Sequence, residues 1–290
     1  MCSSDLAGQV GDIRDTPKFA ASLRGVESVI HLACISNDPS FELDPALART
    51  INYDAFLMLL DLVAKSRVRR FVFASTSSVY GIKSEENVTE DLPLEPLTDY
   101  SKYKVLCEAE LSRAKLPDLT WVTIRPATVC GFSPRLRLDL AVNILTNHAV
   151  NNGRITVFGG GQKRPNIHID DITDLYVDLL ARPDDAIHGR VFNAGWENHA
   201  VSAIARQVQD VVERSGVRRG IEIVTSPTDD NRSYHISSDR IKRELGFEPR
   251  RSIADAIRDL TTAFGDGRVP DAMTDIRYYN IKTMQARQLR

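Results

Sequence analysis

Short apolar runs recur along the chain and are typical of strands buried inside a sheet. Each run is bounded by polar or turn-forming residues and is too short for a buried helix. The runs cover residues 28–34, 70–75, 120–125 and 190–194. We expect them to be strands of one sheet.

Stretches with helical spacing separate these runs. Residues 46–66 repeat apolar side chains along one helix face, namely Leu47, Ile51, Phe56, Leu59, Leu60 and Val63. Residues 100–115 follow Thr98 and Asp99, which are favourable cap residues. This alternation of strands and helices predicts an α/β fold with a doubly wound, Rossmann-like parallel sheet. Two further predicted helices cover residues 170–181 and 199–215.

The chain divides by composition into two lobes and a tail. Residues 1–130 and 166–200 carry the strand and helix pattern and form the predicted Rossmann-like, dinucleotide-binding domain. Residues 131–165 and 201–265 are richer in Gly, Pro and Arg, which favours a smaller substrate lobe toward the C-terminus. The tail, residues 266–290, is expected either to dock as a helix or to fray.

The usual start of a doubly wound dinucleotide-binding sheet is not recognisable in the sequence. That start is a strand, a Gly-rich turn and a helix whose N-terminus binds the pyrophosphate. Gly8 and Gly11 have no apolar strand before them, and residues 159–161 have no helix after them. Residues 1–6 show no periodicity. We therefore expect an N-terminally truncated domain in which the first strand and the Gly-rich turn are missing.

Charge and composition narrow the class of partner. The 290 residues include 37 Lys and Arg against 39 Asp and Glu, so the net charge is -2 and no basic surface indicates nucleic acid or an anionic membrane. The longest apolar run, residues 55–64, contains Asp61 and is too short to span a bilayer. Four cysteines are scattered without the spacing of a metal site or a disulfide framework. We expect a cytoplasmic protein with small-molecule ligands.

Tyr100 and Lys104 have the spacing that places two side chains on one helix face. A free phenol has a pKa of about 10, and a nearby cation lowers that pKa toward the range of a usable base. The spacing alone also fits a solvated helix face. The surrounding residues decide between these interpretations.

A cluster of hydroxyl side chains follows the predicted strand at residues 70–75. Thr76 precedes the sequence VYG at the carboxyl end of that strand, where open α/β sheets bind ligands. The chain resembles the extended short-chain dehydrogenase/reductase family at three places, which are Thr76, the Tyr100 and Lys104 pair, and Arg125 followed by Pro126. The resemblance is to its NAD-dependent nucleotide-sugar epimerases and dehydratases, and it extends over nearly the whole chain.

The resemblance implies roles for individual residues. Thr76 would orient the substrate oxygen, Tyr100 would act as the base, and Lys104 would bind the nicotinamide ribose and lower the tyrosine pKa. The implied NAD-binding residues are Asp12, Ile13, Leu32, Ala33, Asn52, Ser75, Tyr100, Lys104 and Pro126. The implied substrate-binding residues are Thr76, Ser77, Thr128, Asn143, Arg164 and Arg232. The resemblance implies NAD as cofactor and leaves NADP open.

Departures from the family pattern favour one activity over another. Dehydratases of the family carry Asp-Glu where this chain has Ser77 and Ser78, so dehydration is disfavoured. The favoured function is epimerisation of a nucleotide-diphosphate sugar through a transient 4-keto intermediate. A keto-sugar reductase using NAD(P)H and an inactive fragment or binding module are the alternatives. The resemblance also leaves open a homodimer through the helices at residues 46–66 and 100–115.

Other candidate residues have simpler interpretations. His31 and His168 stand without a second ligand at metal spacing, so we expect structural histidines and no metal site. Asp170 and Asp171 lie where a helix begins, and we expect them to cap it. Residues 159–161 are expected to form a turn of the substrate lobe. Taken singly, Arg135, Arg137 and Arg164 are expected to be solvated, and only the resemblance gives Arg164 a role.

Overall fold

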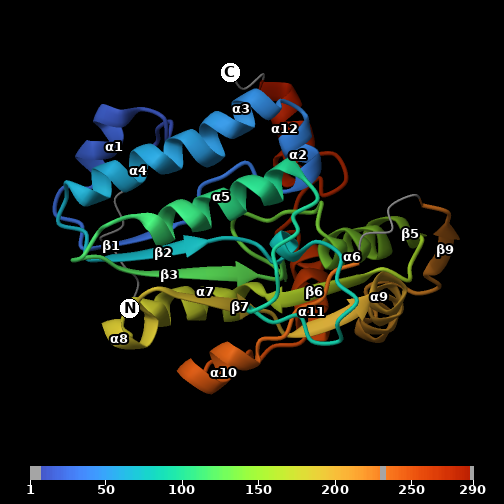
Figure 1. The fold of residues 1–290 in the computed structure, drawn as a ribbon. Coiled ribbons are helices and arrows are strands. Elements are labelled where there is room, and N and C mark those ends of the chain that lie inside the picture. The colour runs from blue at the N-terminus through green and yellow to red at the C-terminus, as the bar shows by residue number, and fades with distance from the viewer. Residues whose placement is uncertain (1–7, 229–232, 288–290) are drawn as a thin grey trace.

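A computed structural model describes residues 8–228 and 233–287. Within these residues, the main sheet has four parallel strands in the order β1-β2-β3-β7 (Figure 1). The strands are β1 (Ser28–His31), β2 (Arg70–Ala74), β3 (Thr120–Pro126) and β7 (Arg190–Ala194). Their register pairs Arg70 with both Ser28 and Thr120, so the carboxyl ends meet at one edge. The predicted α/β fold with a parallel sheet is confirmed.

Helices cover both faces of this sheet because side chains alternate along each strand. Phe71 and Phe73 of β2 pack on one face, whereas Val72 packs on the other. The first face is covered by α1 (Thr16–Ser22), α4 (Ala55–Ala64) and α5 (Asp99–Arg113). The second is covered by α7 (Ile169–Leu179), α8 (Asp184–Ile187) and α10 (Asp239–Leu245). Figure 1 shows α4 and α5 above the sheet and α7 below it.

The helix predicted over residues 46–66 is present but irregular. It is built from α3 (Pro45–Arg49), the π-helical turn η1 (Thr50–Asp54) and α4, and the short helix α2 (Asp38–Glu42) precedes it. A π turn inserts an extra residue and so shifts the face that a helix presents. Here the turn contains Asn52, whose amide hydrogen-bonds both the N–H and the carbonyl of Ile35 at 2.8 and 2.9 Å.

The chain outside the main sheet contains more strands than the sequence pattern indicated. β5 (Arg154–Phe158) pairs in parallel with β9 (Glu222–Ser226), and three helices pack beside this pair: α6 (Ala141–Asn152), α9 (Val201–Ser215) and α11 (Ile253–Gly265). A three-stranded sheet consists of β4 (Thr128–Cys130), β6 (Lys163–His168) and β8 (Glu197–Ala200). These strands are short and β6 contains Pro165, so the apolar alternation that marks a strand is weak. The predicted turn at residues 159–161 joins β5 to β6.

Of the two expectations for the tail, docking is the one observed. Residues after α11 form η3 (Ile276–Tyr278) and α12 (Asn280–Arg287). Tyr279 is buried with Leu260 of α11, and its hydroxyl donates to the carbonyl of Ala272 at 2.7 Å. Asn147 of α6 donates to the same hydroxyl at 3.1 Å. The tail therefore packs against α6 and α11. No described helix is long and apolar enough to cross a membrane.

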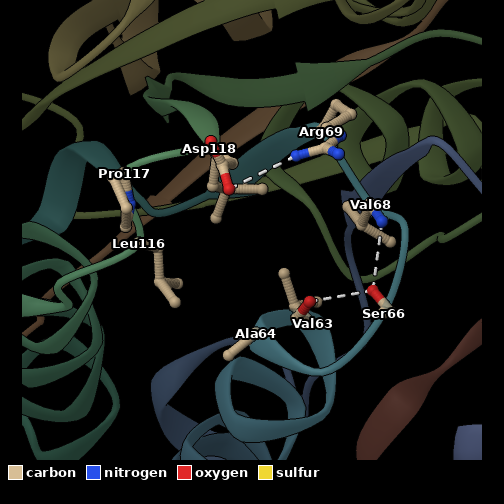
Figure 2. Close-up of a pocket in the computed structure, with 9 residues that line it drawn as sticks. Val63, Ala64, Ser66, Val68, Arg69, Leu116, Pro117 and Asp118 are labelled. Atoms are coloured by element: carbon tan, nitrogen blue, oxygen red, sulfur yellow. Dashed lines mark hydrogen bonds and ion pairs between the residues drawn. The ribbon is translucent and has the colours of Figure 1, made fainter.

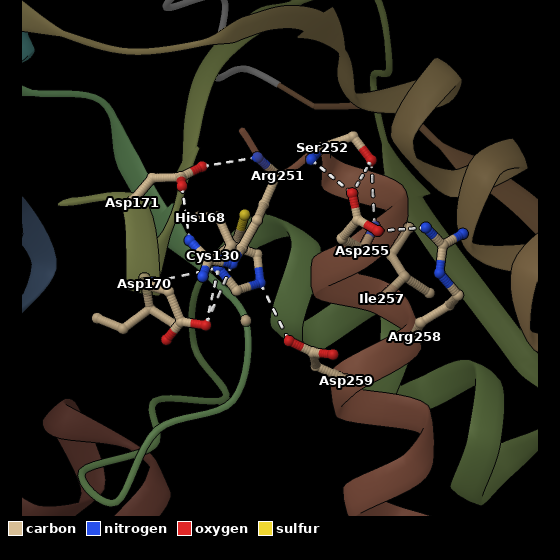
Figure 3. A network of polar contacts seen from close by, with 12 residues as sticks. Cys130, His168, Asp170, Asp171, Arg251, Ser252, Asp255, Ile257, Arg258 and Asp259 are labelled. Atoms are coloured by element: carbon tan, nitrogen blue, oxygen red, sulfur yellow. Dashed lines mark hydrogen bonds and ion pairs between the residues drawn. The ribbon is translucent and has the colours of Figure 1, made fainter. Parts of the chain in front are cut away.

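The predicted capping by Asp170 and Asp171 is wrong. The cap of α7 is His168, whose Nδ1 accepts from the Asp170 N–H at 3.1 Å, while its Nε2 lies 3.2 Å from a carboxylate oxygen of Asp259 (Figure 3). An Nδ1 that accepts an N–H leaves Nε2 as the protonated nitrogen facing Asp259. The two nitrogens of His168 thus join α7 to α11. The hydrogen bonds of His168 explain why Asp170 and Asp259 lie close to it.

Asp171 makes a second connection at the same place. One of its oxygens accepts from the backbone N–H groups of Arg250 and Arg251 at 3.1 and 2.9 Å. The other accepts from the Arg251 guanidinium at 2.7 Å (Figure 3). The carboxylate therefore fixes the segment that enters α11 against the first turn of α7. A buried carboxylate with several donors is costly to disturb.

We expect Asp171→Asn to lower the free energy of unfolding by about 1–3 kcal/mol, because the amide cannot accept all three hydrogen bonds. Asp170→Asn is the matched control, since that side chain is 54% exposed against 3% for Asp171. Urea unfolding should show a lower midpoint for the first variant only. Equal midpoints for the two variants would contradict the assignment.

His31 is packed among aromatic rings on the face of the sheet that α4 covers, with ring centroids 5.5 Å from Phe56 and 6.0 Å from Phe73. Burial lowers the pKa of His31 to about 3. The unfolded chain, with a histidine pKa near 6.5, then binds the proton first, so acid favours unfolding. The expected effect is a loss of stability as the pH falls from about 6.5 toward 3, at up to about 1.4 kcal/mol per pH unit.

His31→Phe keeps the ring packing and removes the titrating group. We expect it to flatten the dependence of unfolding free energy on pH between about pH 7 and about pH 4, measured by urea unfolding. His188→Phe, on the exposed turn before β7, should leave that dependence as in the parent protein. An acid limb that persists in the His31 variant would show that another group causes it.

Candidate functional site

A cleft of about 450 Å³ opens at the carboxyl edge of the main sheet. The segments that follow β1, β2 and β3 line it, together with residues 137 and 139–141, Arg164, Pro165 and Tyr234. Residues of the cleft that the sequence singled out are Thr76, Ser77, Tyr100, Pro126, Thr128 and Arg164. The structure therefore brings together six predicted residues from segments far apart in the sequence.

Tyr100 and Lys104 lie one turn apart on α5, as their spacing predicts, but at different depths. Thr98 caps the helix by accepting from the Ser101 N–H, which sets Tyr100 at the first turn, where it lines the cleft. Lys104 is buried beneath it. Its ammonium donates to the Ala74 carbonyl at 2.6 Å and lies 5.0 Å from the centre of the Phe73 ring. The lysine is thus fixed to the end of β2.

The electrostatics of Tyr100 differ from the sequence-based expectation. Burial raises the pKa of its phenol well above the usual value, and Cys34 and Asp38 add to this rise. The groups that lower the pKa are the Arg137 guanidinium and the Thr76 hydroxyl, which hydrogen-bonds the phenol. The cation among the largest influences on this pKa is Arg137, and Lys104 is not one of them.

A chain of hydroxyl groups leads from Thr76 to the loop after β1. Thr76 Oγ1 and Ser78 Oγ are 3.0 Å apart, and Ser78 Oγ lies 2.9 Å from Ser101 Oγ. Ser101 is in turn 2.9 Å from Thr98, whose hydroxyl donates to Asp38 at 2.6 Å. Each hydroxyl is both donor and acceptor, so the chain fixes the orientation of Thr76 next to Tyr100.

A buried ion pair connects α5 to β3. Glu108, one turn beyond Lys104, accepts from Nε and Nη2 of Arg125 at 3.1 and 2.6 Å. The same carboxylate accepts from the Ser75 hydroxyl. Arg125 also donates to the Tyr80 hydroxyl at 2.8 Å, and Tyr80 donates to Asn193 at 2.7 Å. Burial raises the pKa of Tyr80 to about 12, so it stays protonated as a donor.

Removing Glu108 should leave the buried Arg125 charge without its partner. We expect Glu108→Ala to lower the free energy of unfolding by about 3–5 kcal/mol. Glu110→Ala, two residues away on α5, removes a more exposed carboxylate whose contact with Arg113 is 3.9 Å, and should cost less than about 1 kcal/mol. Thermal unfolding of the pair measures the difference. Similar losses would mean that the buried pair does not anchor α5.

Four of the predicted cofactor-binding residues meet at a second cleft, of about 520 Å³, beside β1. Asp12 and Ile13 line it opposite Leu32 and Ala33. Asp12 is already paired with Arg14 at 2.6 Å, and this hydrogen bond lowers the pKa of the carboxyl to about 2. Leu32 is 55% exposed although it is apolar. The two clefts share the loop after β1, because Ser36 further along that loop lines the first one.

Three predicted ligand-binding residues hydrogen-bond within the protein through their side chains. The amide of Asn52 is used by the Ile35 backbone, as described above. Asn143 accepts from the Gly131 N–H at 3.0 Å and donates to the Arg137 carbonyl at 2.8 Å. It is buried and does not line the cleft. Both asparagines therefore shape loops that border the clefts. Ser75 is likewise buried, with its hydroxyl on Glu108.

The remaining predictions concern arginines. Arg164 of β6 lines the cleft, with its guanidinium 5.5 Å from the Tyr234 ring centre. Arg232 lies outside the described residues. Arg137, which the sequence alone suggested to be solvated, also lines the cleft and is mostly buried. No motif marks Arg137, because its position depends on how the loop after β4 folds back over the sheet.

A smaller hollow of about 90 Å³ lies at the opposite edge, near the amino ends of β2 and β3 (Figure 2). Its polar contacts are an Arg69 to Asp118 ion pair of 3.6 Å and the Ser66 hydroxyl, which bonds the Val63 carbonyl at 2.8 Å (Figure 2). Parallel sheets bind ligands at their carboxyl edge. This hollow is therefore a surface feature of a loop.

Comparison with known proteins agrees with this geometry. The sequence model of the NAD dependent epimerase/dehydratase family matches residues 3–195. The chain belongs to this family, which confirms the resemblance stated from Thr76, Tyr100 and Lys104.

Individual relatives lie within this family. A UDP-glucose 4-epimerase of Lactobacillus helveticus is 26% identical over 271 residues, covering 85% of this chain and 80% of its own length. A dTDP-glucose 4,6-dehydratase of Streptomyces griseus is 29% identical over 256 residues, covering 85% and 74%. Among solved structures, a UDP-glucuronic acid 4-epimerase of Bacillus cereus, in complex with UDP-glucuronic acid and NAD, has a TM-score of 0.75 at 25% identity, covering 88% and 80%.

Proposed function

We propose that this chain is an NAD-dependent 4-epimerase of nucleotide-diphosphate sugars. The observation that carries the proposal is the pairing of Tyr100 with the Thr76 hydroxyl in one cleft, where Ser77 and Ser78 stand in place of acidic residues. Relatives named as UDP-glucose 4-epimerases support the substrate class.

The two clefts suit the two ends of a dinucleotide, and no Gly-rich turn for its pyrophosphate precedes β1 in the described residues. They share the loop after β1, and the exposed Leu32 offers apolar surface that a flat ring would cover. Asp12 lies at one end, where the resemblance places the adenine, and Pro126 and Tyr100 lie at the other, beside the reacting sugar. Bound NAD supplies a hydride acceptor and a positive nicotinamide ring, which favours the Tyr100 phenolate. Lys104, beneath Tyr100, is placed to donate to the ribose once it exchanges its bond to Ala74.

The proposed reaction moves one proton through Tyr100. The phenolate removes the proton of the sugar 4-hydroxyl, while Thr76 donates to the same oxygen and holds it in place. Loss of hydride from C4 to the bound NAD leaves a 4-keto sugar, which rotates in the cleft so that its opposite face is presented. Hydride returns to the opposite face of C4, and Tyr100 gives the proton back to the oxygen. The hydride and the proton that leave the sugar both return to it, so no cofactor is consumed.

Dehydration is less well supported by the same cleft. Eliminating water across C5 and C6 needs an acid and a base at the sugar. The carboxylates that line the cleft are Asp38 and Asp139, which accept from Thr98 at 2.6 Å and from Arg137 at 2.9 Å respectively. Both are engaged in holding loops. The structure thus favours epimerisation over elimination.

Tyr100→Phe should reduce turnover by about 10²–10⁴-fold, because no group then accepts the 4-hydroxyl proton. Tyr103→Phe is the matched control. Tyr103 lies on the same helix as Tyr100 but outside the cleft, where its ring packs against Phe41 and Tyr53. Turnover of this variant should stay near the parent value. NMR of UDP-hexoses incubated with NAD measures turnover. Activity that survives in the Tyr100 variant would remove the tyrosine from the mechanism.

The cofactor and the reaction type are tested with the parent protein. Calorimetric titration should show binding of NAD, and a panel of UDP-, dTDP-, GDP- and CDP-sugars should epimerise without net change in absorbance of the reduced cofactor. Stoichiometric consumption of NADH or NADPH would identify a keto-sugar reductase instead. No binding of NAD would support the non-catalytic alternative.

The exposed Leu57 of α4 and Leu106 of α5 support a homodimer through these helices.

A further inference from the structure

In the proposed reaction, the phenol of Tyr100 must lose its proton before it can act as a base. Burial raises the pKa of this phenol well above its usual value, so the group carries its proton at neutral pH. The phenol hydrogen-bonds Thr76, the first member of the chain of hydroxyl groups described above. That chain ends at the carboxylate of Asp38. A continuous hydrogen-bonded route therefore connects the phenol to an acid group.

The carboxylate at one end fixes the direction of every hydrogen bond in this chain. A carboxylate only accepts, so the Thr98 hydroxyl donates its single proton to Asp38 at 2.6 Å. Ser101 must then donate to Thr98 at 2.9 Å, because each hydroxyl has one proton. In the same way Ser78 donates to Ser101 at 2.9 Å, and Thr76 donates to Ser78 at 3.0 Å. The Thr76 oxygen is left to accept from the phenol, so every bond points toward the carboxylate.

A chain with a single direction can carry a proton along its whole length. Each hydroxyl oxygen takes the proton of the group before it and passes its own proton to the next group, so one O–H bond forms and one breaks at each hydroxyl. The phenol becomes a phenolate, and Asp38 becomes a carboxylic acid. All the hydrogen bonds are then reversed, which makes Thr76 a donor toward Tyr100. The proposed reaction needs Thr76 in this form, because it must donate to the oxygen on C4.

Asp38 is the group near the phenol that can receive this proton. The titratable and charged groups that act on the phenol are Cys34, Asp38 and Arg137, and Lys104 lies beneath it on α5. Arg137 and Lys104 are cations that already donate to acceptors of the protein. The hydroxyl chain ends at Asp38 and not at Cys34. Asp38 is half-buried and lines the cleft, so it can release the proton to solvent.

We propose that the hydroxyl chain is a proton relay, which carries the phenolic proton of Tyr100 to the carboxylate of Asp38. The inference rests on the proposed function, because it gives the base of that reaction its route of ionisation. Ser101 is the member best suited to a test. It is buried and does not line the cleft, so it acts through its neighbours and not on the substrate.

The rate at which Tyr100 ionises tests the relay without any turnover. A rapid pH jump of the full chain with NAD present, followed by the ultraviolet absorbance of tyrosinate, gives this rate. The difference from Tyr100→Phe isolates the one tyrosine. Ser101→Ala removes one hydroxyl of the chain and leaves all charges in place. We expect it to slow the ionisation by about 10²-fold, with the pKa of Tyr100 near the parent value.

Asp38→Asn separates a relay from an effect of charge. The amide oxygen can still accept from Thr98, but the amide cannot take up the proton. Loss of the negative charge lowers the pKa of Tyr100, because Asp38 raises it in the parent protein. The pH profile of the ionisation should therefore move to lower pH while the ionisation itself becomes slower. An effect of charge alone would move the pH profile without slowing the ionisation.

Ser112→Ala is the matched control, since Ser112 is an exposed serine on the same helix. This variant should ionise at the parent rate. Ser78→Ala should be as slow as Ser101→Ala, and Ser78→Thr, which keeps the hydroxyl, should restore most of the rate.

Several results overturn the proposal. The parent rate in Ser101→Ala or in Asp38→Asn would show that the proton leaves by another route. Equal rates in Ser78→Ala and Ser78→Thr would show that packing, and not the hydroxyl, sets the rate. A parent protein in which Tyr100 does not ionise below pH about 10, the pKa of a free phenol, would have no phenolate for the relay to form.

Turnover of nucleotide sugars separates the two proposals. Ionisation that depends on Ser101 and Asp38, without epimerisation of any sugar, would keep the relay and reject the epimerase function. Epimerisation by a Ser101→Ala variant that ionises at the parent rate would keep the function and reject the relay.

Discussion

The ion pair between Glu108 and Arg125 joins α5, the helix that carries Tyr100 and Lys104, to the centre of the sheet. Glu108 belongs to α5, Arg125 to β3, and the bonded Ser75 directly follows β2. Tyr80 extends the connection to Asn193 on β7. Every other feature of the cleft depends on this arrangement, because Tyr100 and Lys104 can face the strand ends only if α5 keeps its position along them. A buried pair is costly to desolvate, and its close two-nitrogen geometry offsets that cost.

Loops complete the cleft, and buried amides shape them. Asn52 satisfies both backbone groups of Ile35, so the loop after β1 follows one path between the two clefts. Asn143 does the same for the segment from Gly131 to Arg137. Irregular backbone near a ligand site cannot satisfy its own polar groups, and a buried amide can supply a donor and an acceptor at once. Two residues that resemble ligand contacts in sequence therefore shape the loops that border the site from behind.

The sequence predicted the parts that depend on local pattern. Phe71, Val72 and Phe73 alternate between faces, and this supported a covered strand; Tyr100 and Lys104 shared a helix face as their spacing required. Depth was not predictable, since it depends on which carbonyl Lys104 meets. The cap of α7 was misassigned because an aspartate usually caps better than a histidine, whereas here Asp171 is needed by Arg250 and Arg251.

The role of Arg137 could not be read from the sequence for a different reason. Its neighbours Ser36, Asp139 and Asn280 come from three segments, and the last of these belongs to a tail whose docking the pattern left undecided. Only the folded tail turns a loop arginine into a fixed charge beside Tyr100. Lys104 donates to a carbonyl of the sheet, while the Arg137 guanidinium lowers the pKa of the phenol from the other side of the cleft. Arg137 thus connects the phenol of Tyr100 to the docked tail, and the cleft takes its shape only when both parts of the chain are folded together.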